Sequence, residues 1–288
     1  MTEALPATQA DVEGTKAGET QVIDIVKKVA KSPSIEEQVA KTGKIGVTIV
    51  TPFRWFPTKP EEQAEYLQDQ APQIGRALRE LADHPFYTFE FLAAVGGICR
   101  ARNGAIHDIL KGTSTWTLNW DQDLRPEDPA AFVLRMLGHR KPIVAGMYCR
   151  RTKRPSWACT FLPVAEVQHE ADGLLQVAEA AGGAKLIINK VYREIRRIFV
   201  TDVNPKAGGQ SIEYIDTDTG EAVTGFYQQP VMDRRLFPED YFLDYLCRCA
   251  QIPIFVDTKT KIRHHDADGT VFPEKWPAIP GVDTEALP

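Results

Sequence analysis

The expected fold rests on one apolar run, IGVTIV at residues 45–50, which ends at Thr51-Pro52. A continuous β-branched run of this kind is typical of a strand buried on both faces. The pattern downstream predicts helices over residues 60–82 and 98–111, and strands over 86–94 and 114–120. Strands and helices therefore alternate with short connections, which indicates an α/β fold with a nucleotide-binding type of sheet.

The second half of the chain continues this alternation. The expected elements are a helix over 129–137, a strand over 142–148, a short strand over 185–189 followed by a helix, a loop or hairpin within 200–230, a helix over 239–250, a strand over 254–256 and a short segment over 261–265. We expect one α/β domain over residues 43–265. A flexible arm over 1–42, with a helix near 21–31, should precede it, and a Pro-rich tail over 266–288 should follow.

Composition excludes several classes of protein. The 288 residues are 43% hydrophobic and 25% charged, which is enough apolar material for a sizeable core. No run of about 18 apolar residues occurs, and residues 1–20 lack the apolar stretch of a secretory signal. The five cysteines are odd in number and have no zinc-like spacing, so we interpret them as reduced thiols. We therefore expect a cytoplasmic protein without a membrane span.

Charge is unevenly distributed along the chain. The net charge is −5, yet residues 135–206 hold thirteen Lys and Arg against six Asp and Glu. Such a segment is either a solvated basic face or a surface that contacts phosphates of a nucleotide or a nucleic acid. Both interpretations stay open at this point.

The strongest chemical feature is DQD at residues 121–123, at the end of an apolar strand. Residues two apart in an extended chain point to the same side, so Asp121 and Asp123 should face one point beyond the strand. Two carboxylates aimed at one point favour a hard divalent cation, Mg²⁺ or Mn²⁺, that bridges to a diphosphate. The alternative is an acidic loop before a helix.

Three further groups could serve the same site. Arg100, Arg102 and Asn103 open a helix after Gly96-Gly97, where arginine forks and free backbone N–H groups suit phosphate oxygens. Glu239-Asp240 opens another helix; it is either favoured there by the helix dipole or supplies a general base. The pair His264-His265 is either a surface feature or completes the coordination of a borderline ion such as Mn²⁺.

In this order, the features resemble the GT-A-fold nucleotide-sugar glycosyltransferases, especially their compact phage-encoded members. The resemblance covers residues 44–265. Its pieces are the strand ending in Thr51-Pro52, ARN at 101–103, DQD at 121–123, RPEDP at 125–129, KPIVAGMY at 141–148, Gly182-Gly183, Glu239-Asp240 with Arg248 downstream, and VD at 256–257 with His264. The resemblance implies a GT-A-like mixed sheet flanked by helices and a metal-dependent glycosyltransferase.

The resemblance also implies roles for individual residues. The metal, Mn²⁺ or Mg²⁺, would be held by Asp121, Asp123 and His264. Asp240 would be the base that deprotonates the acceptor hydroxyl, with Glu239 beside it in the catalytic pair. The residues assigned to the nucleotide-sugar donor, a UDP-sugar for preference, are Thr51, Arg54, Arg102, Asn103 and Asp121.

The acceptor is less determined. Arg150, Arg151, Lys153 and Arg154 surround Trp157, which would suit a nucleic-acid backbone with an aromatic ring for a base to stack on. The resemblance to phage enzymes implies hydroxymethylated DNA as a candidate acceptor, and a small glycan or a protein acceptor fits equally. Two other functions stay open, a nucleotidyltransferase and a non-catalytic module that binds nucleic acid or carbohydrate.

Overall fold

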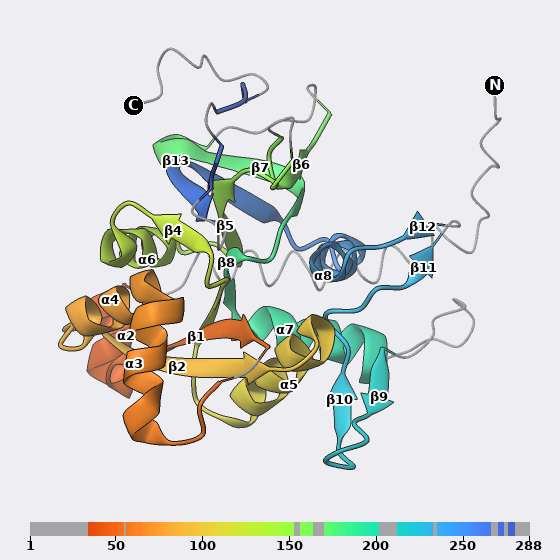
Figure 1. Ribbon diagram of the computed structural model, residues 1–288. Helices are drawn as coiled ribbons and strands as arrows, with labels where there is room; N and C mark the ends of the chain where they lie inside the picture. The colour runs from red at the N-terminus through yellow and green to blue at the C-terminus, as the bar shows by residue number, and fades with distance from the viewer. Residues whose placement is uncertain are drawn as a thin grey trace.

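The computed structural model describes residues 34–54, 56–152, 156–163, 170–201, 212–232, 235–265, 270–273 and 276–279. In these ranges ten strands form one mixed sheet with the order β2-β1-β3-β8-β5-β13-β7-β6, while β4 and β14 pair with β13 outside that path. Helices pack against both faces of this sheet (Figure 1). The expected fold class, a mixed α/β sheet flanked by helices, is confirmed.

The elements have the following bounds. The helices are α2 (Ile35–Thr42), α3 (Pro60–Gln70), α4 (Pro72–Leu81), α5 (Ile98–Lys111), α6 (Pro129–Gly138), α7 (Asn189–Arg196) and α8 (Glu239–Cys249), with a 3₁₀ turn at Ala171–Gly173 and a π turn at Arg197–Thr201. The strands are β1 (Ile45–Phe53), β2 (Tyr87–Val95), β3 (Trp116–Trp120), β4 (Leu124–Pro126), β5 (Ile143–Tyr148), β6 (Cys159–Phe161), β7 (Leu174–Ala180), β8 (Ala184–Ile188), β9 (Glu213–Ile215), β10 (Ala222–Thr224), β11 (Val231–Met232), β12 (Arg235–Leu236), β13 (Ile254–His265) and β14 (Val271–Phe272).

The directions of the strands show where the carboxyl ends of β1, β2 and β3 lie. β1 pairs in parallel with both β2 and β3, so Val47 lies opposite Phe89 on one side and Trp116 on the other. The carboxyl ends of these three strands therefore meet at one edge, and β3 continues there into Asp121. β8 runs antiparallel between β3 and β5, which is why the sheet is mixed rather than wholly parallel.

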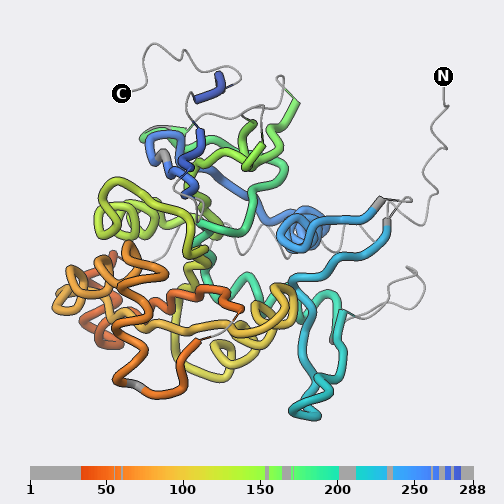
Figure 2. The backbone as a smooth tube through the Cα atoms, in the orientation of Figure 1, coloured from red at the N-terminus to blue at the C-terminus, as the bar shows by residue number. Residues whose placement is uncertain are grey.

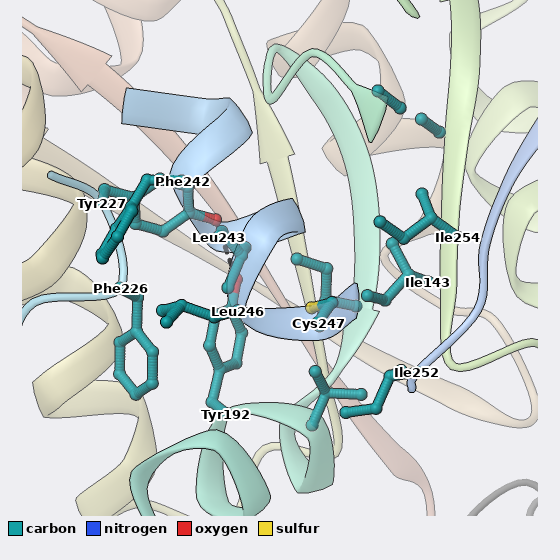
Figure 3. Packing of buried hydrophobic residues seen from close by; sticks show 14 of the residues in the cluster. Ile143, Tyr192, Phe226, Tyr227, Phe242, Leu243, Leu246, Cys247, Ile252 and Ile254 are labelled. Atoms are coloured by element: carbon teal, nitrogen blue, oxygen red, sulfur yellow. Dashed lines mark hydrogen bonds between the residues drawn. The ribbon is translucent and has the colours of Figure 1, made fainter. Parts of the chain in front are cut away.

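The two faces of the sheet form two cores. Side chains alternate along a strand, so Ile143 and Ala145 of β5 join one core while Val144 between them joins the other. The first core also contains α5, α7 and α8, and the second contains α4 and α6. Figure 3 shows part of the first core, where Leu246 of α8 lies near Tyr192 of α7. Because the central strands are covered on both faces, β5 is almost wholly apolar, while the two polar residues of β3, Thr117 and Asn119, are buried and hydrogen-bonded.

The prediction of a single helix over residues 60–82 is wrong. Two helices, α3 and α4, replace it, with the break at Ala71-Pro72. Pro72 has no N–H to continue the ladder, and its ring disfavours helical geometry at the preceding residue. Ala71 accordingly has φ −141° and ψ 57°, and Pro72 becomes the first residue of α4.

The strand ending at residue 256 and the segment over 261–265 are one long strand, β13. A register shift between Asp257 and Lys261 interrupts its pairing with β5, which explains the apparent gap in the sequence pattern. β7 was not expected at all, although it pairs antiparallel with β13 through Ile254 and Val177.

The prediction of a flexible arm over residues 1–42 is wrong for residues 35–42. Residues 35–42 form α2, which begins with a complete capping box between Ser34 and Glu37. Ile35 and Val39 pack against the second core. The helix expected near residues 21–31 lies outside the described residues.

The C-terminal segment and the middle hairpin complete the fold. Phe272 pairs with His264, and Ile279 is buried in the first core, so the described parts of the tail, residues 270–273 and 276–279, lie along the domain. The expected hairpin within 200–230 is formed by β9 and β10, which project from the body of the molecule (Figure 2). Arg100 of α5 holds this hairpin with two 2.9 Å hydrogen bonds to Asp216. Among the described helices, none has the length and apolar character for crossing a membrane.

Candidate functional site

Four segments meet at the carboxyl edge of β1, β2 and β3. They are the end of β3 with Asp121, the second turn of α5 with Arg102, the first turn of α8 with Glu239 and Asp240, and the turn between β7 and β8 with Gly182-Gly183. Sequence analysis had selected the first three independently as chemical features, and the structure brings them together.

Arg102 is the centre of this group. Its side chain is only 2% exposed; Nη2 donates to Asp121 Oδ1 at 2.8 Å, and Nη1 donates to Glu239 Oε1 at 3.4 Å. The guanidinium also lies over the Tyr227 ring, 5.5 Å from its centroid. Burial acts to lower the pKa of Arg102, but the carboxylates of Asp121, Glu239 and Asp240 and the Tyr227 hydroxyl outweigh it and raise that pKa. Arg102 therefore stays charged and orients two carboxylates.

The glycine pair lets the backbone approach these side chains closely. A Cβ on Gly183 would lie 2.6 Å from Asp121 Oδ2 and 2.9 Å from the Tyr148 hydroxyl. A Cβ on Gly182 would lie 3.0 Å from Asp240 Cβ. Since real side chains do not tolerate contacts of 2.6 Å, Gly183 is required for this arrangement.

Backbone groups of the same turn bind the surrounding side chains. Gly182 N–H donates to Asp240 Oδ2 at 3.0 Å, and Gly183 N–H donates to the Tyr148 hydroxyl at 2.9 Å. Burial raises the pKa of Tyr148 well above its usual value, and Asp121 and Asp240 raise it further, so the hydroxyl stays protonated. Sequence analysis missed Tyr148 as a site residue, because a tyrosine at the end of an apolar strand carries no local chemical signal.

Charge at the site is negative. Asp121, Glu239 and Asp240 contribute three carboxylates around a single guanidinium. The Asp121 side chain is 28% exposed and the Glu239 side chain 16% exposed, so both reach solvent while Arg102 does not. A partly exposed cluster of carboxylates of this kind attracts a cation or a hydroxyl group that can donate a proton.

Asp123 and His264 lie on two segments beside this group, the turn before β4 and the strand β13. The backbone N–H of His265 donates to the Asp123 carbonyl at 2.9 Å, and the Asp123 carboxylate forms an ion pair with Arg151. His264 Nδ1 lies 2.6 Å from the Cys149 carbonyl, so Nδ1 carries the proton and Nε2 has the lone pair. Metal-binding histidines show the same pattern, with one ring nitrogen bonded to a backbone carbonyl.

The carboxylates expected to hold a metal are each paired with an arginine. Among the described residues, no three His, Cys, Asp or Glu side chains form a ready metal cluster. Residues 121–124 form a turn, closed by a 3.1 Å hydrogen bond from the Leu124 N–H to the Asp121 carbonyl, and not the extended stretch expected from the sequence. Asp121 pairs with Arg102, and Asp123 pairs with Arg151. Mg²⁺ is usually held by one or two carboxylates and by substrate phosphates rather than by an all-protein cage, and Asp121 and Asp123 are residues of this type.

The other residues assigned to the donor have different environments. Thr51 is fully buried at the end of β1, and its Oγ1 has no hydrogen-bond partner within the described ranges. Arg54 is exposed one residue after that strand. Asn103 is buried and its amide is used by Tyr227, since Nδ2 donates to the Tyr227 carbonyl at 2.9 Å and Oδ1 accepts from its N–H at 2.8 Å. Asn103 therefore holds the segment before α8.

The residues assigned to the acceptor do not form the surface that the sequence predicted. Arg150 is exposed and donates to the Tyr241 hydroxyl at 2.6 Å, while Arg151 pairs with Asp123. Trp157 is only 6% exposed, stacks on Trp276 at 5.4 Å and donates to the Ala278 carbonyl. The expectation of an exposed aromatic platform at Trp157 is wrong because the C-terminal segment covers that ring. Arg154 and Lys153 lie outside the described residues.

Comparison with known proteins gives similarities at the level of overall architecture. No protein-family model matches the chain, and no curated protein matches it in sequence. A197 from STIV is similar over 82% of this chain and 98% of its own, with 12% identity and a TM-score of 0.43. GalNAc-T7 with UDP, GalNAc and Mn²⁺ is similar over 78% of this chain and 44% of its own, with 9% identity and a TM-score of 0.40. UDP-glucose pyrophosphorylase complexed with UDP-glucose is similar over 85% and 81%, with 10% identity and a TM-score of 0.35. Similarities of this size do not identify an activity.

Proposed function

We propose that this protein is a glycosyltransferase that moves a sugar from a nucleoside-diphosphate donor, a UDP-sugar for preference, to an acceptor hydroxyl. The observation that carries the proposal is the convergence of Asp121, Glu239 and Asp240 around the buried Arg102, beside Gly182-Gly183. These groups lie at the carboxyl edge of parallel strands, where open α/β sheets bind their ligands.

The donor diphosphate would bind together with a divalent cation. Asp121 and Asp123 would hold Mn²⁺ or Mg²⁺, with His264 as a further ligand through Nε2. When bound, the ion supplies positive charge that offsets the charge of the leaving diphosphate. Arg102 holds Asp121 in place by the 2.8 Å hydrogen bond, so this carboxylate is oriented before the donor arrives.

The protein's own part in the transfer is assigned to Asp240. In the reaction the bond between the sugar anomeric carbon and the diphosphate oxygen breaks, and a bond to the acceptor oxygen forms. The acceptor hydroxyl proton passes to the Asp240 carboxylate, which is oriented by N–H groups of Gly182 and Tyr241 at 3.0 and 2.9 Å. Glu239, held by Arg102 and by Gln229 Nε2 at 3.3 Å, lines the acceptor side.

For the acceptor we propose a hydroxymethylated base of DNA. Arg150 is exposed next to α8 and within the basic segment, where it can contact a backbone phosphate. A base inside a duplex would have to be flipped out of the helix to reach Asp240. Binding of hydroxymethylated and plain duplexes, measured at two salt concentrations, tests this choice, and no binding at low salt would leave a small glycan or protein acceptor.

Donor hydrolysis with and without Mn²⁺ tests the activity. The wild-type protein should release a nucleoside diphosphate from UDP-sugars in a metal-dependent manner. Asp123→Ala should abolish the metal-dependent turnover while the protein stays folded. Asp240→Asn should lower kcat for transfer by about 10²- to 10⁴-fold with little change in donor affinity. Asp83→Asn, an exposed loop aspartate, is the matched control.

Three outcomes would redirect the proposal. Release of pyrophosphate from a nucleoside triphosphate would indicate a nucleotidyltransferase. Near-wild-type turnover of Asp123→Ala at low Mn²⁺ would contradict the metal role, and loss of donor binding in Asp240→Asn would make Asp240 a binding residue rather than a base.

A further inference from the structure

A separate polar cavity lies on the outer face of the β4–β13 pair. It has a volume of about 530 Å³ and is lined by Gln73, Arg125, Pro126, Glu127, Arg263, His265 and Trp276. None of these residues belongs to the set proposed for donor, metal or proton transfer. Three of the seven lining residues are Arg or His.

Strand register explains why the basic side chains gather there. Arg263 of β13 lies directly opposite Arg125 of β4, and His265 follows two residues later on the same face. The alternate residues Leu124, Ile262 and His264 are buried on the opposite face. The pairing of β4 with β13 therefore places Leu124, Ile262 and His264 on the buried face and the side chains of Arg125, Arg263 and His265 in the cavity.

This arrangement is unfavourable without a counter-charge. Like charges directly opposite each other in an antiparallel pair repel. Within the described ranges neither Arg125 nor Arg263 forms an ion pair, and Arg125 Nε is buried without a hydrogen-bond partner. Glu127 is the only carboxylate among the described lining residues, and it is exposed. Among the described residues, the two guanidinium groups therefore have no direct charge partner.

We propose that this cavity is a phosphate-binding site. Two guanidinium groups on one face provide paired N–H donors that match phosphate oxygens, and Gln73 adds a neutral amide at the edge. The cavity volume exceeds that of a single phosphate, so the group can be inorganic phosphate or a phosphate carried by a nucleotide or a nucleic-acid backbone. The proposal is independent of the reaction assigned to the carboxylate site.

The test measures binding of inorganic phosphate to the full-length protein by calorimetry at pH 7.5, with sodium chloride at matched ionic strength as reference. Arg263→Gln should weaken phosphate binding by about tenfold or more, as expected for loss of one charge-assisted contact. Arg76→Gln is the matched control, because Arg76 is an exposed arginine of the adjacent α4 that pairs with Glu80 instead. It should bind phosphate as the wild type does.

A second variant tests the facing arginine. Arg125→Gln should also weaken phosphate binding, because Arg125 lies directly opposite Arg263 and lines the same cavity. Circular dichroism and thermal unfolding of both variants, compared with the wild type, separate lost binding from lost folding.

Two further titrations identify the compound that supplies the phosphate. A nucleoside monophosphate and a short single-stranded oligonucleotide are titrated in the same way, and tighter binding than inorganic phosphate shows which phosphate compound the site takes. Equal phosphate binding by the wild type, Arg263→Gln and Arg125→Gln would overturn the proposal.

Discussion

Lys185 Nζ lies 2.7 Å from Asp244 Oδ1, and both side chains are completely buried. The other carboxylate oxygen of Asp244 accepts from the Ala180 backbone N–H at 2.7 Å. One helical turn earlier, Asp240 accepts from Gly182 in the same β7–β8 connection. Two aspartates four residues apart on α8 thus attach this helix to β7 and β8, which places Asp240 beside Arg102.

Breaking this buried pair should destabilise the protein strongly. Asp244→Leu leaves Lys185 buried without a counter-charge, and we expect a loss of about 3–5 kcal/mol in the free energy of unfolding. The double variant Lys185→Met/Asp244→Leu should recover most of that loss, because no buried charge remains. Urea denaturation of both single variants and the double variant measures the coupling. Additive losses would show that the two side chains do not act as a pair.

The same pair should make stability depend on pH. Burial raises the pKa of Asp244 to about 6, and Lys185 only partly opposes this shift. The folded protein then holds the proton more tightly than the unfolded chain, where an aspartate has a pKa of about 3.9. The stability contributed by the protonated form is present below about pH 4 and is lost as the pH rises through about 6.

The measurement compares the wild type with Lys185→Met/Asp244→Leu between pH 4 and pH 7. The difference in unfolding free energy, wild type minus double variant, should fall over this range. A flat difference would mean that Asp244 titrates alike in the folded and unfolded states.

Gly183→Ala should impair the candidate site more than the fold. The added methyl group would meet Asp121 Oδ2 at 2.6 Å and the Tyr148 hydroxyl at 2.9 Å, so Asp121 must move. We expect donor turnover to fall by about 10²-fold, as for misplacement of an aligned group by about 1 Å. Gly104→Ala on α5, where a methyl group meets nothing within 4 Å, is the control and should retain activity. Unchanged turnover in Gly183→Ala would remove Asp121 from the reacting groups.

Asn103→Ala should act through stability. The substitution leaves the buried N–H and carbonyl of Tyr227 without their partner, which costs about 1–3 kcal/mol for each unsatisfied group. Thermal unfolding should show a lower Tm, while the donor KM of the remaining folded protein should change little. A variant with wild-type Tm and a raised donor KM would instead support the donor-binding role expected from the sequence.

Local patterns by themselves determined several elements of this protein. The apolar run at residues 45–50 corresponds to β1, the periodicity over 98–111 matches α5 residue for residue, and acids at 239–240 mark the start of α8. Such signals arise because strand and helix periodicities are short-range properties of the chain. The same reasoning placed Asp121 after a buried strand, at the edge where it is found.

Tertiary structure alone decided which side chains meet. Arg102 binds Glu239 across 137 positions of sequence, and Trp276 of the C-terminal segment covers Trp157. The burial of Lys185 with Asp244 likewise depends on α8 packing against β7 and β8. No local pattern encodes such contacts, because burial and charge pairing depend on which elements pack together and in which register. The sequence therefore identified the chemical groups of the candidate site. Packing determined which of these groups are buried, which are paired and which are open to a substrate.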